Sequence, residues 1–284
     1  MMKTVHTIEA LRKEIHQQRS KGKRIGFAPT MGNLHEGHIT LIKEGLKQSD
    51  VMVSSVFVNP TQFGEGEDFS DYPRTLPQDQ EKLSAAGCHL LFAPAVDEMY
   101  PEDQDTWAKV VVTEVTSRHC GASRPGHFDG VSTVVTKLFN IVQPDVALFG
   151  KKDFQQLAVI RRMTTALCFD IEIIGVDTVR EDNGLAMSSR NGFLSADEKH
   201  RAATLYQCLC QAKKDIQNGN TDFESIRTRS NHTLQQAGFE PDYFTICRAD
   251  DLERAGPNDH KLVILAAARM GKARLIDNID FSRG

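Results

Sequence analysis

The spacing of hydrophobic positions predicts strands and helices that alternate over roughly the first 177 residues. Ile8, Leu11 and Ile15 recur at helical spacing among charged residues, so we expect an amphipathic helix near the start. The run 51–58 is mostly apolar and rich in valine, which is typical of a strand buried on both faces. Further strands are expected at 24–29, 90–93, 145–149 and 171–177, and further helices at 41–46, 78–86, 131–142 and 154–167. This alternation indicates βαβ units around a parallel sheet.

The pattern changes after about residue 177. Ser195–Glu198 and Thr221–Glu224 both have the form of a capping box, which opens a helix. Three β-like runs follow, at 242–248, 261–268 and 273–279. Helices followed by clustered strands favour a separate α+β unit. We therefore expect an α/β domain over residues 1–176 and a smaller α+β domain over residues 177–284.

Composition narrows the class of protein. Hydrophobic residues make up 40% and charged residues 25%, which is ordinary for a globular chain. The formal net charge of -4 gives no overall positive field, so we expect no nucleic-acid partner. No apolar leader precedes the first helix, and no apolar run is long enough to span a bilayer. We expect a cytoplasmic protein with no membrane association.

The six cysteines do not suggest a metal site. None of them forms a CxxC pair, so a structural zinc site is not expected. Reduced and mostly buried thiols are the ordinary state of such cysteines in a cytoplasmic protein.

The first chemical motif is PTMGNLHEGH, residues 29–38, which joins a predicted strand to a predicted helix. Open α/β sheets bind ligands at the carboxyl ends of their strands. A helix N-terminus also offers free N–H groups and a positive dipole end to a phosphate. His35 and His38 are three residues apart and share one helix face, where imidazoles can donate to phosphoryl oxygens. Outside this context, two surface histidines beside a glycine-rich turn would be the ordinary interpretation.

Two further motifs carry cations and hydroxyls. Gly150-Lys151-Lys152-Asp153 also follows a predicted strand and precedes a helix. Lys152 can neutralise phosphate charge, and Asp153 can cap the helix or hold a ribose or a metal ion. Met187-Ser188-Ser189-Arg190 places two hydroxyls and a guanidinium in one loop, which suits a polyphosphate. Taken alone, the first is also compatible with a solvated turn and the second with a polar linker.

Two glutamines are candidates for binding a hydroxy acid. Gln62 follows the strand at 51–58, and Gln156 lies in the first turn of the helix at 154–167. Neutral amides can hold a hydroxy acid without neutralising its carboxylate, which then stays nucleophilic. Isolated glutamines are more often surface residues, so this interpretation depends on the other motifs. The segment 59–77, rich in Gly, Pro, Asp and Asn, is expected to be a long loop of the kind that covers active sites.

Together these motifs resemble the pantothenate synthetase family, within the nucleotidyltransferase superfamily that carries HIGH and KMSKS elements. The similar segments are PTMGNLHEGH, FVNPTQFGEGEDFSDYPRT, RPGHFDGVSTVVTKLFNIVQPD, FGKKDFQQL and VREDNGLAMSSRN. The resemblance extends over residues 3–281. The sequence departs from the family in two places, because Lys151 stands where Glu is usual and MSSR is a loose form of KMSKS.

The resemblance implies a Rossmann-like N-terminal domain that binds ATP and pantoate, and a C-terminal domain that acts as a lid. It implies condensation of pantoate with β-alanine to give pantothenate, AMP and pyrophosphate through a pantoyl-adenylate. Mg²⁺ bound to ATP and a homodimer are also implied, whereas no protein residue is assigned as a metal ligand. The implied catalytic residues are His35, His38, Lys152, Ser188, Ser189 and Arg190. The implied ATP contacts are Met31, Gly32, Asn33, Leu34, His35, Glu36, Gly37, His38, Gly150, Lys151, Lys152, Asp153, Val179, Met187, Ser188, Ser189 and Arg190. Gln62 and Gln156 are the implied contacts of pantoate and β-alanine.

Three other functions are weighed against this one. An adenylyltransferase would share the first motif and the fold, but it would need a cationic site for a phosphorylated acceptor where this chain has Gln62 and Gln156. A non-catalytic nucleotide sensor would not need both histidines, Lys152 and the Ser-Ser-Arg loop. A class I tRNA synthetase is disfavoured because no basic anticodon-binding extension is evident. Identification of the products separates the ligase from the adenylyltransferase, because only the ligase releases free AMP. Turnover of ATP with pantoate and β-alanine decides against a sensor.

Overall fold

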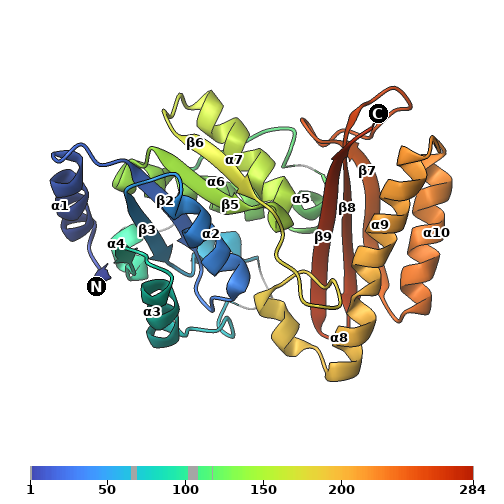
Figure 1. Cartoon of the computed structure of the whole chain (residues 1–284), viewed down its shortest axis with the longest axis horizontal. Helices are drawn as coiled ribbons and strands as arrows, with labels where there is room; N and C mark the ends of the chain where they lie inside the picture. The colour runs from blue at the N-terminus through green and yellow to red at the C-terminus, as the bar shows by residue number, and fades with distance from the viewer. Residues whose placement is uncertain (1, 65–68, 102–107, 117, 284) are drawn as a thin grey trace. The chain divides into compact units, whose positions relative to one another are not determined.

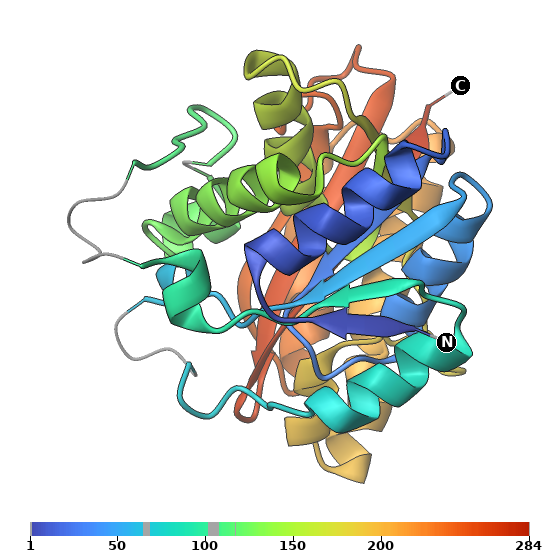
Figure 2. The same cartoon turned by 90° about the vertical axis from the view of Figure 1, so that its left-hand side faces the viewer.

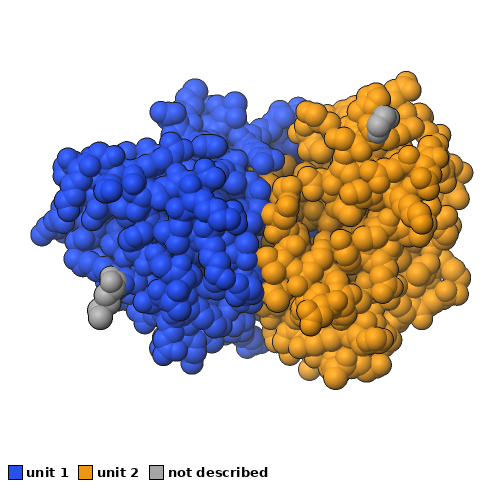
Figure 3. Space-filling view, in the orientation of Figure 1, with its two compact units in different colours: residues 1–150, 159–176 blue, residues 151–158, 177–284 orange. Residues whose placement is uncertain are grey.

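The computed structural model describes residues 2–64, 69–101, 108–116 and 118–283. Its chain forms two compact units, which Figure 3 colours separately. Unit 1 comprises residues 1–150 and 159–176, and unit 2 comprises residues 151–158 and 177–284. Within the described ranges, every helix falls short of the length and apolarity that crossing a bilayer would require.

Unit 1 is built on a six-stranded parallel sheet, as the alternating pattern predicts. The strands run in the order β1-β4-β3-β2-β5-β6 (Figure 1). Their bounds are β1 Lys3–Val5, β2 Ile25–Thr30, β3 Val51–Val56, β4 Leu90–Phe92, β5 Val146–Gly150 and β6 Glu172–Val176. The chain moves outward from β2 to β3 and β4, then returns to place β5 on the other side of β2. The strand order therefore reverses between β2 and β5, which is the switch point where such sheets bind ligands.

Helices cover both faces of this sheet. Helix α2 (Glu36–Leu46) and helix α3 (Leu76–Ala85) lie on one face, where Leu41, Ile42 and Leu83 join an apolar core with Met52 and Leu148. On the other face α1 (Ile8–Arg19) lies beside α6 (His127–Val142), as Figure 2 shows. The other helical elements that the structure describes before β6 are η1 Pro60–Gln62, α4 Val96–Met99, α5 Cys120–Ser123, η3 Lys151–Asp153 and α7 Phe154–Ala166.

Unit 2 contains a three-stranded antiparallel sheet in the order β7-β8-β9. Its strands are β7 Glu240–Arg248, β8 Lys261–Met270 and β9 Ala273–Ser282. Helices α9 (Thr204–Gln217) and α10 (Phe223–Gln236) pack on the sheet through buried leucines and isoleucines. Helix α8 (Ala196–Ala202) and the 3-10 helix η4 (Ser189–Phe193) precede them. The predicted fold class, a Rossmann-like parallel domain with a smaller α+β domain, is confirmed.

The structure corrects several element boundaries. The capping box at Ser195 and Glu198 is present, but α10 is capped by Asp222 rather than by Thr221. The Asp222 side chain accepts from Ser225 N at 3.0 Å. Helix α6 begins at His127, four residues before the predicted start at 131. The expected long loop at 59–77 contains η1, α3 begins at Leu76, and residues 65–68 of this loop lie outside the described residues.

Candidate functional site

The loop after β2 is held by α3. Gly32 has φ +86°, in the left-handed region that glycine adopts without strain, and Asn33 follows at φ 51°. Asp79 on α3 is fully buried, and its two oxygens accept from Asn33 N at 2.9 Å and Leu34 N at 2.8 Å. Lys82, one turn later on α3, donates from Nζ to Leu34 O at 2.6 Å. One helix thus binds both the N–H and the C=O groups of this loop.

His35 and His38 form a capping box at the start of α2. His35 Nδ1 accepts from Gly37 N, and His38 Nδ1 accepts from His35 N, each at 3.2 Å. A neutral imidazole that accepts at Nδ1 carries its proton at Nε2. Both rings are therefore set as Nε2–H donors, and their centroids lie 4.1 Å apart. A Cβ at Gly37 would lie 2.9 Å from the His35 ring, so this position needs a residue without a side chain.

Gln62 ends η1 and is almost fully buried. Its Oε1 accepts from Asn59 Nδ2 at 3.2 Å, and its Nε2 donates to Met31 Sδ at 2.8 Å. The second contact joins Gln62 directly to the loop after β2. The structure therefore brings together Met31, His35, His38 and Gln62 in unit 1.

Several residues around Gln62 were not assigned a role from the sequence. Asn59 is fully buried, and its Oδ1 accepts from Tyr100 Oη at 2.9 Å. The Gln62 carbonyl accepts from His127 Nδ1 at 2.8 Å and from Arg124 Nη2 at 3.4 Å. Burial raises the pKa of Tyr100, which keeps its hydroxyl a donor. Asn59 lies in the family-like segment FVNPTQF, and Arg124 and His127 lie in RPGHFDG. The spacing of these residues along the sequence does not by itself indicate a chemical role.

The lysine turn follows β5 directly. Lys151, Lys152 and Asp153 form η3, and Gln156 lies half-buried in the first turn of α7. Lys151 Nζ pairs with Asp177 Oδ1 at 2.7 Å and with Asp280 Oδ2 at 3.3 Å. Burial lowers the pKa of Lys151, but these two carboxylates outweigh it and leave that pKa raised. Lys151 stands where the family usually has Glu. The carboxylates of Asp177 and Asp280 stabilise the positive charge of this lysine.

The Ser-Ser-Arg loop directly follows a short hairpin in the chain. Met187 N donates to Val179 O at 2.9 Å, so the two residues lie side by side at the open end of the hairpin. Ser188 caps η4, and its Oγ accepts from Arg190 N at 3.2 Å. The buried Asn191 anchors the far end of the loop, since its Nδ2 donates to Glu181 Oε1 and to Ala186 O. Unit 2 thus contains ammonium, hydroxyl and guanidinium donors in Lys152, Ser188, Ser189 and Arg190.

Comparison with known proteins gives a consistent answer. A family model described as pantoate-beta-alanine ligase matches residues 3–280. The chain is 54% identical over 283 residues to pantothenate synthetase of Hahella chejuensis, a match that covers 100% of both chains. It is also 54% identical over 282 residues to pantothenate synthetase of Shewanella amazonensis, with 99% of this chain and 100% of that protein covered.

Solved structures agree with the sequence matches. A crystal structure of pantothenate synthetase from Thermus thermophilus superposes with a TM-score of 0.92 at 42% identity, covering 98% of this chain and 99% of that one. A pantoate-beta-alanine ligase from Francisella tularensis, complexed with beta-gamma ATP and beta-alanine, gives a TM-score of 0.80 at 33% identity over 99% and 98% of the two chains. The likeness extends over both units.

Proposed function

Because this chain belongs to the pantoate-beta-alanine ligase family, we propose that it condenses pantoate with β-alanine at the expense of ATP, through the residues described above. The products are pantothenate, AMP and pyrophosphate. The match over residues 3–280 carries this conclusion, since it covers every motif that was given a chemical role. Retention of both histidines, Lys152 and the Ser-Ser-Arg loop supports an active enzyme rather than a nucleotide sensor.

The chemistry explains why such residues are needed. A carboxylate is a poor acylating agent because its leaving group would be oxide. Attack of the pantoate carboxylate on the α-phosphorus forms a pantoyl-adenylate and expels pyrophosphate. The β-alanine amine then attacks the acyl carbon, the C–N bond forms, and AMP leaves with the bonding electrons. The protein must align the first attack and stabilise charge on the phosphate oxygens.

We assign that stabilisation first to the histidines. Their Nδ1 atoms are engaged by backbone N–H groups, so each ring directs its Nε2–H to hydrogen-bond acceptors. His38 is the proposed catalytic donor to the α-phosphate, with His35 beside it. Donors that are fixed before the reaction stabilise developing charge without reorganisation in the transition state. The capping box is what fixes them.

The remaining donors are assigned to the triphosphate and the acid. Lys152, Ser189 and Arg190 supply charge and hydrogen bonds to phosphates. The Ser188 hydroxyl accepts from Arg190 N and keeps its own proton for donation. Gln62 and Gln156 are assigned to pantoate, with Gln62 also near β-alanine. Neutral amides leave the pantoate carboxylate nucleophilic.

Magnesium fits this chain as a component of MgATP. Among the described residues, no three His, Cys, Asp or Glu side chains gather as metal ligands. Mg²⁺ at nucleotide sites typically takes one or two carboxylates together with substrate phosphates and water. Asp153, beside Lys152 at the end of η3, offers one such carboxylate. The ion supplies neutralisation of triphosphate charge when bound.

The decisive experiment is an assay with ATP, pantoate and β-alanine in which every product is identified. Formation of pantothenate with equal amounts of AMP and pyrophosphate is the expected result. Incorporation of AMP into a phosphorylated acceptor, with no free AMP, would instead identify an adenylyltransferase.

We also propose that residues 177–284 act as a lid, that the protein is cytoplasmic and that it forms a homodimer. The mass of the native enzyme in solution tests the homodimer.

A further inference from the structure

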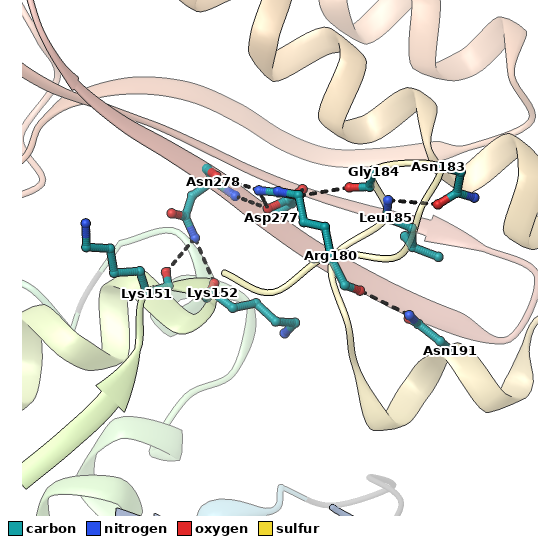
Figure 4. A network of polar contacts seen from close by, with 10 residues as sticks. Lys151, Lys152, Arg180, Asn183, Gly184, Leu185, Asn191, Asp277 and Asn278 are labelled. Atoms are coloured by element: carbon teal, nitrogen blue, oxygen red, sulfur yellow. Dashed lines mark hydrogen bonds and ion pairs between the residues drawn. The ribbon is translucent and has the colours of Figure 1, made fainter. Parts of the chain in front are cut away.

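Two consecutive residues of β9 have buried polar side chains that hydrogen-bond to loops outside the sheet. Asp277 and Asn278 are both about 95% buried, in a strand that is otherwise largely apolar at buried positions. Successive strand residues point to opposite faces, so the two side chains leave β9 in different directions (Figure 4). Each reaches a different loop of unit 2.

Asn278 holds the lysine turn by its backbone. Its Nδ2 donates to Lys151 O at 2.9 Å and to Lys152 O at 2.8 Å. Both amide protons are therefore used, and the carbonyls on either side of the Lys152 N–H group are fixed. The Lys151 ammonium strengthens the same attachment through Asp280, which also lies on β9.

Asp277 holds the hairpin that leads into the Ser-Ser-Arg loop. Its two oxygens accept from Arg180 Nη1 at 2.6 Å and Nη2 at 2.9 Å, a bidentate pair. The guanidinium also donates to Gly184 O at 3.1 Å and lies 3.5 Å from the centroid of the Tyr206 ring. Arg180 pairs across the hairpin with Ala186, the residue before Met187.

We propose that Asp277 and Asn278 are positioning residues that fix the Lys152 turn and the Ser188–Arg190 loop relative to each other through one strand. This inference rests on the proposed function of those loops. Phosphate donors on two separate loops contribute most when each loop holds its donors within reach of their oxygens. A rigid strand that binds each loop by two hydrogen bonds provides that common reference. Displacement of a catalytic group by about 1 Å can cost roughly 100-fold in rate.

The test begins with Asn278→Ala in the full-length enzyme. We expect kcat/KM for ATP to fall about 10- to 100-fold, with little change in KM for β-alanine. Asn278→Asp keeps the shape but turns a carboxylate towards two carbonyl oxygens, so it should lose at least as much. Asn278→Ser reaches neither carbonyl and gives the same test if the alanine variant fails to fold.

Double-mutant cycles separate positioning from simple destabilisation. In a Lys152→Ala background, Asn278→Ala should have almost no further effect, because the group that it positions is gone. In an Arg190→Ala background, Asp277→Asn should likewise add little. The crossed pairs, Asn278→Ala with Arg190→Ala and Asp277→Asn with Lys152→Ala, should be closer to additive.

Leu275→Ala is the matched control, because Leu275 is a buried β9 residue in the apolar core of unit 2. It should lower the unfolding midpoint while leaving kcat/KM for ATP within about twofold of wild type. Wild-type pantothenate synthesis is measured first, so a failure of the proposed function is seen separately. An active wild type whose Asn278→Ala variant keeps wild-type ATP kinetics would overturn the inference, and so would full additivity in all four cycles.

Discussion

His38 combines two roles that substitutions can separate. Its Nδ1 caps α2 by accepting from His35 N, and its Nε2–H is the proposed donor to the α-phosphate. His38→Ala should lower the rate of adenylate formation by about 100-fold or more, the usual cost of a positioned donor. Loss of the cap should also cost about 1 kcal/mol of stability. Single-turnover measurement of pyrophosphate release, together with urea unfolding, gives both quantities.

His38→Asn is the control for this prediction. The Asn side chain carries an acceptor near the position of Nδ1 but nothing near Nε2. It should recover most of the lost stability and none of the lost rate. A folded His38→Ala enzyme with near-wild-type turnover would remove His38 from the mechanism.

Gln156→Ala should weaken the use of pantoate more than the use of ATP. Gln156 lies in the first turn of α7, after the lysine turn, where an amide can meet the acid without contacting the triphosphate. We expect kcat/KM for pantoate to fall at least tenfold and KM for ATP to change by less than threefold, since one hydrogen bond to a charged group contributes about 1.5–3 kcal/mol. Steady-state kinetics with each substrate varied in turn measures both. Gln236→Ala is the control, because Gln236 lies at the exposed end of α10. Equal losses for pantoate and ATP in the Gln156→Ala enzyme would contradict the assignment.

The sequence predicted the location of His35 and His38 correctly because local signals determine it. A glycine-rich turn between an apolar strand and an amphipathic helix is visible in the sequence over about 20 residues. Arg124 and His127 were not assigned, because their shared partner, the Gln62 carbonyl, is distant in the chain. His127, for example, meets the Gln62 carbonyl 65 residues away. Only the folded chain shows that these residues surround Gln62.

At the level of secondary-structure elements, α3 stabilises the loop after β2. Asp79 is buried and binds two backbone N–H groups of that loop. Asp79→Ala would remove the acceptor from the buried Leu34 N–H and from the half-buried Asn33 N–H, and we expect a loss of roughly 2–4 kcal/mol in the free energy of unfolding. Chemical unfolding of the purified variant measures this loss.

Asp197→Ala is the comparison variant for Asp79. The Asp197 side chain is 76% exposed and pairs with Arg201 four residues later on α8. Exposed pairs of this kind contribute about 0.5 kcal/mol or less. If the two variants were equally stable, the bonds from Asp79 to the loop would have no net effect on folding.

The elements that the sequence did not predict are those with little local pattern. Strand β1 has only Val5 buried among its three residues, so no alternation marks it. Its partner is β4, which begins more than 80 residues later. The grouping of residues 151–158 with unit 2 depends on β9, more than 120 residues along the chain. Long-range pairing of this kind carries no periodic signature.

At the scale of the whole molecule, the two-step chemistry predicts a partial reaction. The enzyme should exchange labelled pyrophosphate into ATP when pantoate is present and β-alanine is absent. Pyrophosphate leaves before any amine is needed, and the bound pantoyl-adenylate can react backwards with the label. His38→Ala should suppress this exchange together with the full reaction. Exchange that requires β-alanine would overturn the proposed order of steps.

Buried thiols in both units predict a loss of stability at high pH. Burial raises the pKa of Cys88 to about 12 and that of Cys208 to about 11, from an ordinary value of 9.0. The folded chain therefore holds protons that the unfolded chain releases above pH 9. The stabilisation is complete below pH 9 and is lost as the pH rises towards 12. Between pH 9 and 11, Cys88 alone should cost roughly 2 kcal/mol.

Urea unfolding at a series of pH values measures this loss. Cys88→Ala should be less stable than wild type at pH 8, because it leaves a small cavity, but its stability should fall less between pH 9 and 11. Parallel curves for the two proteins would show that ionisation of Cys88 is not coupled to folding.

The contacts of Asn278 also have a consequence for the order of events during synthesis. Lys152 is translated 126 residues before the amide that fixes its carbonyl. At about 5–20 residues per second, the ribosome needs roughly 6–25 s to cover that interval. Throughout that time the lysine turn lacks the two hydrogen bonds that β9 supplies. A nascent chain can complete the parallel sheet first, but it acquires the fully anchored turn only when synthesis has reached its last strand.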